Sequence, residues 1–408
     1  MATHVRFRIR NKSNNEVSFK RTVKKNLLNA PGWITDKKIV VIESDDWGSI
    51  SMPSLEVYNK LKEKGVPLGD SSFAKYDSLE SEDDLNELFH VLTQFRDFKG
   101  NHPSITACAV VANPDFDKIE DSGFQEYFYE PITETYKSYP NHSKSFEIWK
   151  KGMEKRLLWP QFHGREHLNP NEWLKAIHSG NDYEKIAFEN KALLAVTDQI
   201  SSKRFMGYLA AFDYEDLNEL IGFEKVIAEG LDLFEDLFGF RSTSFVAPTS
   251  IRSDKMDSYL WSNGIKYHQM GAQFLPYSEA RFAIRNRIVG SKNRLGQLYW
   301  RRNGTFEPSR NWSHDWVSQV LNEMKVAIST KKPFVISSHR VNYIGHIVKE
   351  NRENTLTLLN KLLKKILKEY PDVEFMSSDQ LGDEIEGAPK YFMGINPKTY
   401  YFDKKYNP

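Results

Sequence analysis

The chain lacks the features that mark disulfide-stabilised, membrane-spanning and nucleic-acid-binding proteins. Among its 408 residues there is one cysteine, Cys108, so no intrachain disulfide can form and a reducing compartment is indicated. No stretch approaches the roughly 18 consecutive apolar residues of a membrane-spanning helix. The 56 Lys and Arg residues nearly cancel the 55 Asp and Glu residues. A net charge of +1, without a zinc-finger or basic-helix pattern, excludes a nucleic-acid partner.

Residues 1–35 form a basic arm in which Lys and Arg far outnumber acidic residues. Such an arm is typical of a solvated tail or a short edge hairpin, and contact with an anionic surface is the alternative. It lacks the apolar segment of a secretory signal, so we expect a cytoplasmic protein.

Strand-like and helix-like segments alternate from residue 36 to residue 385. This alternation predicts a single α/β domain, either a barrel or a wound sheet, with long insertions at residues 115–150 and 271–312. Residues 386–408 form a polar and aromatic tail. Strands are predicted at residues 39–42, 104–112, 157–162, 204–212, 244–247, 265–269, 333–337 and 373–376, and helices at 54–64, 82–98, 171–178, 182–200, 220–238, 254–263, 316–329 and 352–370.

Two adjacent carboxylates, Asp45 and Asp46, follow the buried apolar run of residues 39–42. In parallel α/β folds, ligands bind at the carboxyl ends of the strands. Neighbouring carboxylates repel each other, so the pair needs a cation, a shared proton or many hydrogen bonds. A solvated turn is the plain alternative.

A second cluster, His163 and His167, follows the apolar strand predicted at residues 157–162. Spacing of four residues on a helical turn places both imidazoles on one face, close enough to share a metal. Two histidines and one carboxylate are the three protein ligands of an open hydrolytic metal site.

His339 ends a third apolar strand. A histidine at this edge, apart from the metal pair, is a candidate general acid, and Asp379 or Asp213 is expected to orient it and raise its pKa. Pro248 ends the strand at residues 244–247, so the backbone N–H of Thr249 is a candidate oxyanion donor. Trp47, Trp300 and Tyr343 are candidate sugar-stacking rings, with core packing as the alternative for each, and Arg340 is a further candidate to contact the substrate.

Taken in order, these segments resemble the polysaccharide deacetylase family of metal-dependent carbohydrate esterases (family four type). The matching residues are Ser44-Asp45-Asp46, His163 to His167, Val246-Ala247-Pro248 and Ile336 to His339. The resemblance implies a distorted, incomplete (β/α) barrel of about seven parallel strands. It also implies that Asp45 is the catalytic base, that Asp46, His163 and His167 hold the metal, and that His339 is the acid.

The chain departs from the family pattern at Val246, where the family has an arginine that orients the base. Arg241, Arg252, Arg165 and Arg340 are the candidate replacements, and an inactive site is the alternative. The family's fourth motif, an Asp/Trp-containing segment, has no clear copy, and the interval between Asp46 and His163 is longer than usual.

The sequence therefore predicts a metal-dependent deacetylase of an N-acetylated sugar or polysaccharide precursor. Zinc suits the nitrogen and oxygen ligands, and cobalt, nickel, iron and manganese fit as well. A metal-dependent glycosyltransferase that uses the Asp-Asp motif, a catalytically inactive carbohydrate-binding protein on the same barrel, and a hydrolase of non-sugar amides are the alternatives.

Overall fold

The computed structural model describes residue 27 and residues 29–178, 182–194, 207–280, 283–387 and 392–393. A large sheet lies at its centre, with the strand order β11-β8-β7-β6-β3-β2-β13-β12 and with β14 paired to β2. Every strand pair in this sheet is parallel, and the sheet curls into an open half-barrel. The predicted fold class is thus confirmed. The strands are β2 Lys38–Trp47, β3 Ile105–Val110, β6 Leu158–Gly164, β7 Ser244–Phe245, β8 Tyr267–His268, β11 Leu298–Tyr299, β12 Gly304–Thr305, β13 Phe334–His339 and β14 Val373–Met376.

Seven of these strands fall where the sequence predicts them, and two do not. Both β11 and β12 lie within residues 271–312, which were expected to be an irregular insertion. Each is only two residues long, too short to produce a periodic pattern. The strand predicted at 204–212 is wrong: residues 207–209 form a 3₁₀ turn, and residues 204–206 lie outside the described part of the chain.

Most predicted helices are present. The matching helices are α2 Leu55–Glu63, α4 Glu82–Leu92, α8 Pro170–His178, α9 Asp182–Glu189, α10 Leu217–Phe238, α11 Asp257–Ser262 (after the 3₁₀ turn η3 Asp254–Met256), α13 Trp316–Ser329 and α14 Lys349–Glu369. Helix α4 ends six residues before the predicted boundary, and the residues after it include a turn in which Asp97 binds the backbone N–H groups of Lys99 and Asn101. Residues 195–200, predicted to continue α9, lie outside the described part.

The insertion at residues 115–150 is mostly ordered into short elements. The remaining elements of the chain are β1 Gly32–Trp33, α3 Ser72–Tyr76, β4 Ala112–Pro114, α5 Phe116–Asp121, β5 Tyr129–Pro131, α6 Ile132–Ser138, α7 Ser145–Glu154, β9 Ala272–Phe274, α12 Tyr277–Ala280, β10 Ile284–Asn286, α15 Ser378–Gly387, β15 Phe392–Met393 and the 3₁₀ turns η1 Gly207–Leu209, η2 Pro248–Ser250, η4 Pro308–Arg310 and η5 Arg340–Asn342.

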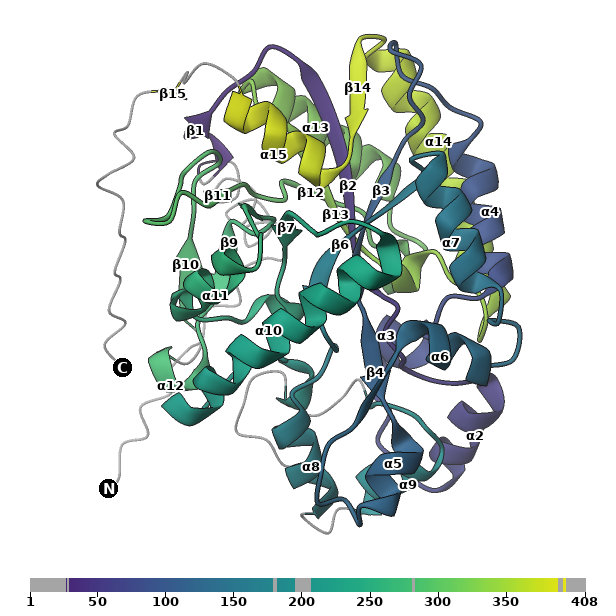
Figure 1. Cartoon of the computed structure of the whole chain (residues 1–408). Helices are drawn as coiled ribbons and strands as arrows, with labels where there is room; N and C mark the ends of the chain where they lie inside the picture. Colours follow the sequence, from purple (N-terminus) through teal and green to yellow (C-terminus); the bar gives the residue numbers. More distant parts are fainter. Residues whose placement is uncertain are drawn as a thin grey trace, which may run out of the picture.

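Helix α10 shows how sequence pattern becomes packing. Its N-cap Asp216 accepts hydrogen bonds from the N–H groups of Asn218 and Glu219. Gly239 ends the helix at φ 79°, a left-handed conformation that glycine adopts without strain. The apolar stripe, which includes Ile227, Leu231 and Phe234, is buried in the main core, and the helix crosses β6 (Figure 1). This packing fixes the outer side of β6, the strand that carries His163 near its end.

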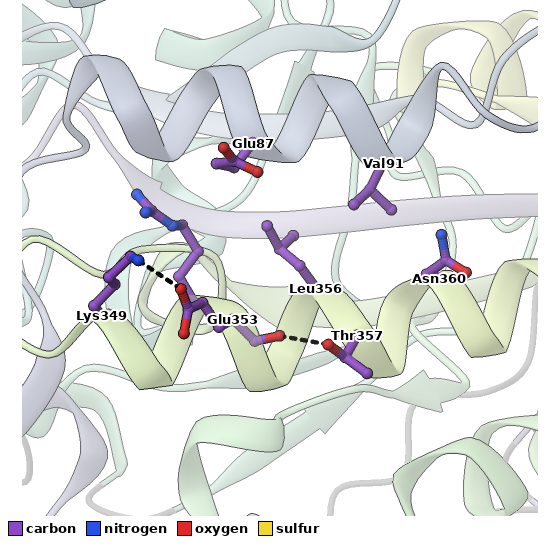
Figure 2. A pocket seen from close by; sticks show the side chains of 8 residues that line it. Glu87, Val91, Lys349, Glu353, Leu356, Thr357 and Asn360 are labelled. Atoms are coloured by element: carbon purple, nitrogen blue, oxygen red, sulfur yellow. Dashed lines mark hydrogen bonds and ion pairs between the residues drawn. The ribbon is translucent and has the colours of Figure 1, made fainter.

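Helices α4, α7 and α14 lie side by side on one flank of the sheet (Figure 1). Between α4 and α14 there is a cavity of about 410 Å³ with a charged lining (Figure 2). An ion pair of 2.8 Å joins Lys349 and Glu353 beside it. This cavity contains none of the predicted site residues. In the part of the chain that the structure describes, no helix is long and apolar enough to cross a membrane.

Candidate active site

The two carboxylates at the end of β2 are held by an irregularity in the strand. The register of β2 against β3 shifts between Ser44 and Trp47, and Asp46 has φ 75°. Successive side chains of a regular strand point to opposite faces, whereas a bulge re-aims one of them. As a result, Asp45 and Asp46 both face groups of the same site, although through different partners. A left-handed aspartate is strained, and such strain is concentrated at functional sites.

Asp46 meets His163 and His167, as the sequence predicts. The Nε2 atoms of His163 and His167 lie 3.4 Å and 3.1 Å from Asp46 Oδ1. Ligand atoms of the three residues all lie within 4.8 Å of one another. Burial alone would raise the pKa of Asp46, but the two imidazoles hold it well below its usual range.

The hydrogen bond on the far side of the His163 ring shows that this cluster fits a metal. His163 Nδ1 lies 2.8 Å from the carbonyl oxygen of Val246, which only accepts hydrogen bonds, so Nδ1 carries the proton. In the neutral imidazole, the buried Nε2, which has no hydrogen-bond partner, presents a lone pair toward the Asp46 carboxylate. A lone pair and a carboxylate facing each other repel unless a cation lies between them. Two nitrogens and one oxygen are a ligand set of open transition-metal sites.

The two histidines are not on a helical turn, so that expectation is wrong. His163 belongs to β6, and His167 lies in the bend that follows. Gly164 has φ 134°, and a Cβ there would lie 3.0 Å from the backbone oxygen of Glu166. The glycine therefore lets the chain reverse and bring His167 back beside His163, with ring centroids 5.3 Å apart.

Asp45 is held by Arg302, a residue that the sequence did not indicate. The Nη1 and Nη2 atoms of Arg302 lie 2.5 Å and 2.7 Å from the two carboxylate oxygens of Asp45. Its Nε donates to Glu43, which is fully buried. Burial raises the pKa of Asp45, but Arg302 outweighs burial and lowers it to about 2, so the carboxylate is ionised at neutral pH.

None of the four arginines expected to replace the one missing at Val246 orients Asp45, so that expectation is wrong. Each is engaged by other acidic groups: Arg241 by Asp232 and Glu235, Arg252 by Asp257, Arg165 by Glu166 and Glu229, and Arg340 by Asp77 and Glu80. Arg302 follows the two-residue strand β11 in the second insertion, and the only signal for it is a pair of arginines after a short apolar run.

His339 is oriented by Glu307. Its Nδ1 lies 2.5 Å from Glu307 Oε1, and its Nε2 lies 3.9 Å from Asp45 Oδ2. Burial would lower the pKa of His339, but Glu307 raises it to about 9, so the imidazole is protonated at neutral pH. Asp379 and Asp213, the expected partners, bind other groups: Asp379 accepts from Trp159 and Ser377, and Asp213 accepts from the N–H groups of Tyr214 and Tyr277.

The remaining predicted residues are structural or lie beside the site. Trp47, Trp300 and Tyr343 are at most 1% exposed and pack in the core, so none can stack on a sugar. Arg340 is fully buried and ties Asp77 and Glu80 together, so it does not contact substrate. Pro248 is buried next to half-buried Thr249, whose φ of 55° turns the backbone at the end of β7. Cys108 is buried, as predicted, and donates to Gln269.

Comparisons with known proteins show likenesses of fold only. No protein-family model matches the chain, and no curated protein matches it. The fold resembles a putative polysaccharide deacetylase from Mycobacterium smegmatis (10% identity, 90% of this chain and 98% of the other, TM-score 0.40). It also resembles Puue allantoinase (9% identity, 88% of this chain and 95% of the other, TM-score 0.44). A further similar structure is a probable polysaccharide deacetylase from Pseudomonas aeruginosa PAO1 (10% identity, 85% of this chain and 90% of the other, TM-score 0.40). With identities this low and TM-scores under 0.5, these likenesses assign neither a family nor an activity.

Proposed function

We propose that this chain is a metal-dependent hydrolase that removes the acetyl group from an N-acetylated sugar or polysaccharide precursor, as a polysaccharide deacetylase does. The observation that supports it best is the division of labour between two adjacent carboxylates. Asp46 faces two imidazoles, whereas Asp45 is paired with a guanidinium and held ionised. One carboxylate is thus suited to a metal, and the other is suited to accept a proton.

Asp46, His163 and His167 would hold a divalent transition metal; zinc suits this ligand set, and cobalt, nickel, iron and manganese also fit it. Such an ion polarises a bound carbonyl and makes water a better nucleophile at neutral pH. The same N and O ligands do not distinguish among these metals, so the proposal names a divalent transition metal and not one element.

The other residues carry the proton transfers. Asp45 takes a proton from the water that attacks the amide carbonyl, and the bidentate contact with Arg302 fixes the direction of its carboxylate. His339 gives its proton to the amide nitrogen as the C–N bond breaks, so the nitrogen leaves as an amine. The backbone N–H of Thr249 is a donor for the oxyanion. Water and the acetamido sugar give acetate and the amino sugar.

The acetamido sugar is proposed from the acid–base pair together with the resemblance in sequence. An amine is a poor leaving group and needs a positioned acid, which His339 provides. The absence of an arginine at Val246 motivated an inactive carbohydrate-binding protein as an alternative. Arg302 removes this motive, because it contacts both carboxylate oxygens of Asp45 and so can orient the base in place of that arginine.

The proposal is tested by metal content and acetate release. Elemental mass spectrometry of the purified protein should find about one transition metal per chain, and the His163→Ala/His167→Ala double variant should lose it. Incubation of the loaded protein with acetylated sugars should release acetate. A wild-type protein that takes up no zinc or cobalt would overturn the proposal, and a glycosyltransferase that uses magnesium or manganese with nucleotide-sugars would then be tested.

A further inference from the structure

A row of aromatic rings runs from His339 to the protein surface. The rings of Phe73 and His339 form a T-shaped pair, with centroids 5.2 Å apart and planes at 90°. Tyr76 follows Phe73 by three residues on α3, so both rings lie on the same side of that short helix. Tyr76 in turn stacks on Trp312, with centroids 5.5 Å apart and an angle of 18° between the planes. We call Phe73, Tyr76 and Trp312 the aromatic row.

The outer end of this row is open to solvent. The Trp312 residue is 41% exposed, whereas Trp47 and Trp300 are at most 1% exposed. One face of the indole is covered by Tyr76, so the exposure falls on the rest of the ring. A single exposed indole is ordinary on a protein surface. An indole fixed by stacking on Tyr76, on the same short helix as the Phe73 ring that contacts His339, is a preformed flat surface near the site.

The backbone around the row holds the rings in place. Helix α3 packs against η4 and η5, the turns that follow Glu307 and His339. The hydroxyl of Ser71 caps α3 by accepting from the N–H of Ala74. Trp312 follows Glu307 by five residues, on the same connection. The indole is therefore positioned by the segment that also orients the proposed acid.

We propose that the stacked pair Tyr76–Trp312 is a subsite for a second pyranose ring of the substrate, on the side where the amine leaves. This inference rests on the proposed function, because it uses His339 as the group nearest the sugar nitrogen. The sugar that carries the nitrogen lies against His339, and the next ring along the polymer lies over the row. The C–H face of a pyranose is apolar and matches a flat aromatic surface. The substrate is accordingly an oligosaccharide or polysaccharide, rather than a free monosaccharide.

Trp261 offers a matched control for Trp312. It is 55% exposed and lies near the end of α11. Asn263, two residues after Trp261, accepts hydrogen bonds from Arg241, which lies just before the start of β7. Trp261 is thus placed toward the opposite edge of the sheet from the site. Both substitutions remove an exposed indole, so a general loss of stability affects the two alike.

The test compares Trp312→Ala with Trp261→Ala in two assays. In the first, acetate release is measured with N-acetylglucosamine and with its β-1,4-linked tetramer. Trp312→Ala should raise KM for the tetramer about tenfold, with little change in kcat and little change in KM for the monosaccharide. Trp261→Ala should match the wild type with both substrates. Equal kinetics of the two variants on the tetramer would overturn the subsite.

The second assay measures binding without turnover and keeps the two proposals apart. Calorimetric titration of the tetramer into Asp45→Asn should give a dissociation constant that rises about tenfold when Trp312→Ala is added and not when Trp261→Ala is added. If Trp312→Ala weakens tetramer binding in this way but the wild type releases no acetate, the subsite is supported and the proposed deacetylase activity is overturned. If the tetramer does not bind, the sugar subsite is overturned. It is also overturned if Trp312→Ala weakens the binding of a nucleotide-sugar and leaves tetramer binding unchanged.

Discussion

Asp45 and His339 are direct register partners on neighbouring parallel strands, and their side chains come within 3.9 Å of each other. Each is oriented by a charged residue from one short segment, Asp45 by Arg302 and His339 by Glu307. The proposed base and the proposed acid thus share one supporting connection, between β11 and β13.

Replacing Arg302 should disable the proposed base. In Arg302→Gln, the largest influence that opposes burial is lost and the pKa of Asp45 rises, so the acid limb of the pH–rate profile should move to higher pH and kcat should fall roughly 100-fold. The neighbouring Arg301 provides the control. It donates to Asn29 and to the backbone oxygen of Gly271, so Arg301→Gln should leave kcat within about threefold. Unchanged pH profiles in both variants would contradict the role of Arg302.

Glu307 should set the alkaline limit of activity. As the proposed proton donor, His339 must be protonated, so the rate should fall as the pH rises through its pKa of about 9. In Glu307→Gln the anion is removed and burial dominates, which lowers the pKa of His339 and moves the alkaline limb to lower pH. Asp379→Asn, which removes a carboxylate that does not contact His339, should not move it. A pH–rate profile between pH 6 and 10 decides the matter.

Asp45 and Asp46 should respond differently to the same substitution. Asp46→Asn should weaken metal affinity by more than about 100-fold, because it removes a proposed direct ligand. Asp45→Asn should keep the metal and lose about 10²–10⁴-fold in kcat, because it removes only the base. Metal titrations and rates measured side by side check both expectations. Equal metal loss in the two variants would show that both carboxylates bind the ion.

Two glycines of α10 form a matched pair for stability. A Cβ on Gly230 would lie 2.8 Å from the ring of Phe162 and 3.0 Å from Arg165, the residues on either side of His163 and Gly164. Gly230→Ala should therefore lower the free energy of unfolding by about 1–3 kcal/mol and weaken metal binding. A Cβ on Gly222 meets nothing within 4 Å, so Gly222→Ala should raise the free energy by about 0.5–1 kcal/mol. Denaturant melts of both variants provide the measurement.

The sequence predicts well what depends on local pattern. The apolar runs before Asp45, His163 and His339 identified three strands of the sheet, and their parallel arrangement brought the polar ends together. Helix α10 was predicted from its apolar stripe and its terminal glycine. The cluster of Asp46, His163 and His167 follows from these same elements, because the carboxyl ends of parallel strands meet at one edge.

What depends on distant pairing was missed. Arg302 reaches Asp45 across 257 residues of sequence, and it follows a two-residue strand that no periodicity indicates. Glu307 lies in the same irregular stretch. The spacing of His163 and His167 suits a helix, but Gly164, with φ 134°, provides a tight reversal that gives the same proximity. Spacing alone therefore predicted that the two histidines lie close together, but with the wrong backbone conformation.

The short connection that carries Arg302, Glu307 and Trp312 has a mechanical consequence. A shift of this segment by a single residue would separate Arg302 from Asp45 and Glu307 from His339. It would also move Trp312 away from Tyr76. The ionisation of the proposed base and acid and the stacking on the proposed neighbouring sugar would then change together. If a substrate sugar binds Trp312 as proposed, a displacement of this indole would also displace Arg302 and Glu307, which set the ionisation of Asp45 and His339.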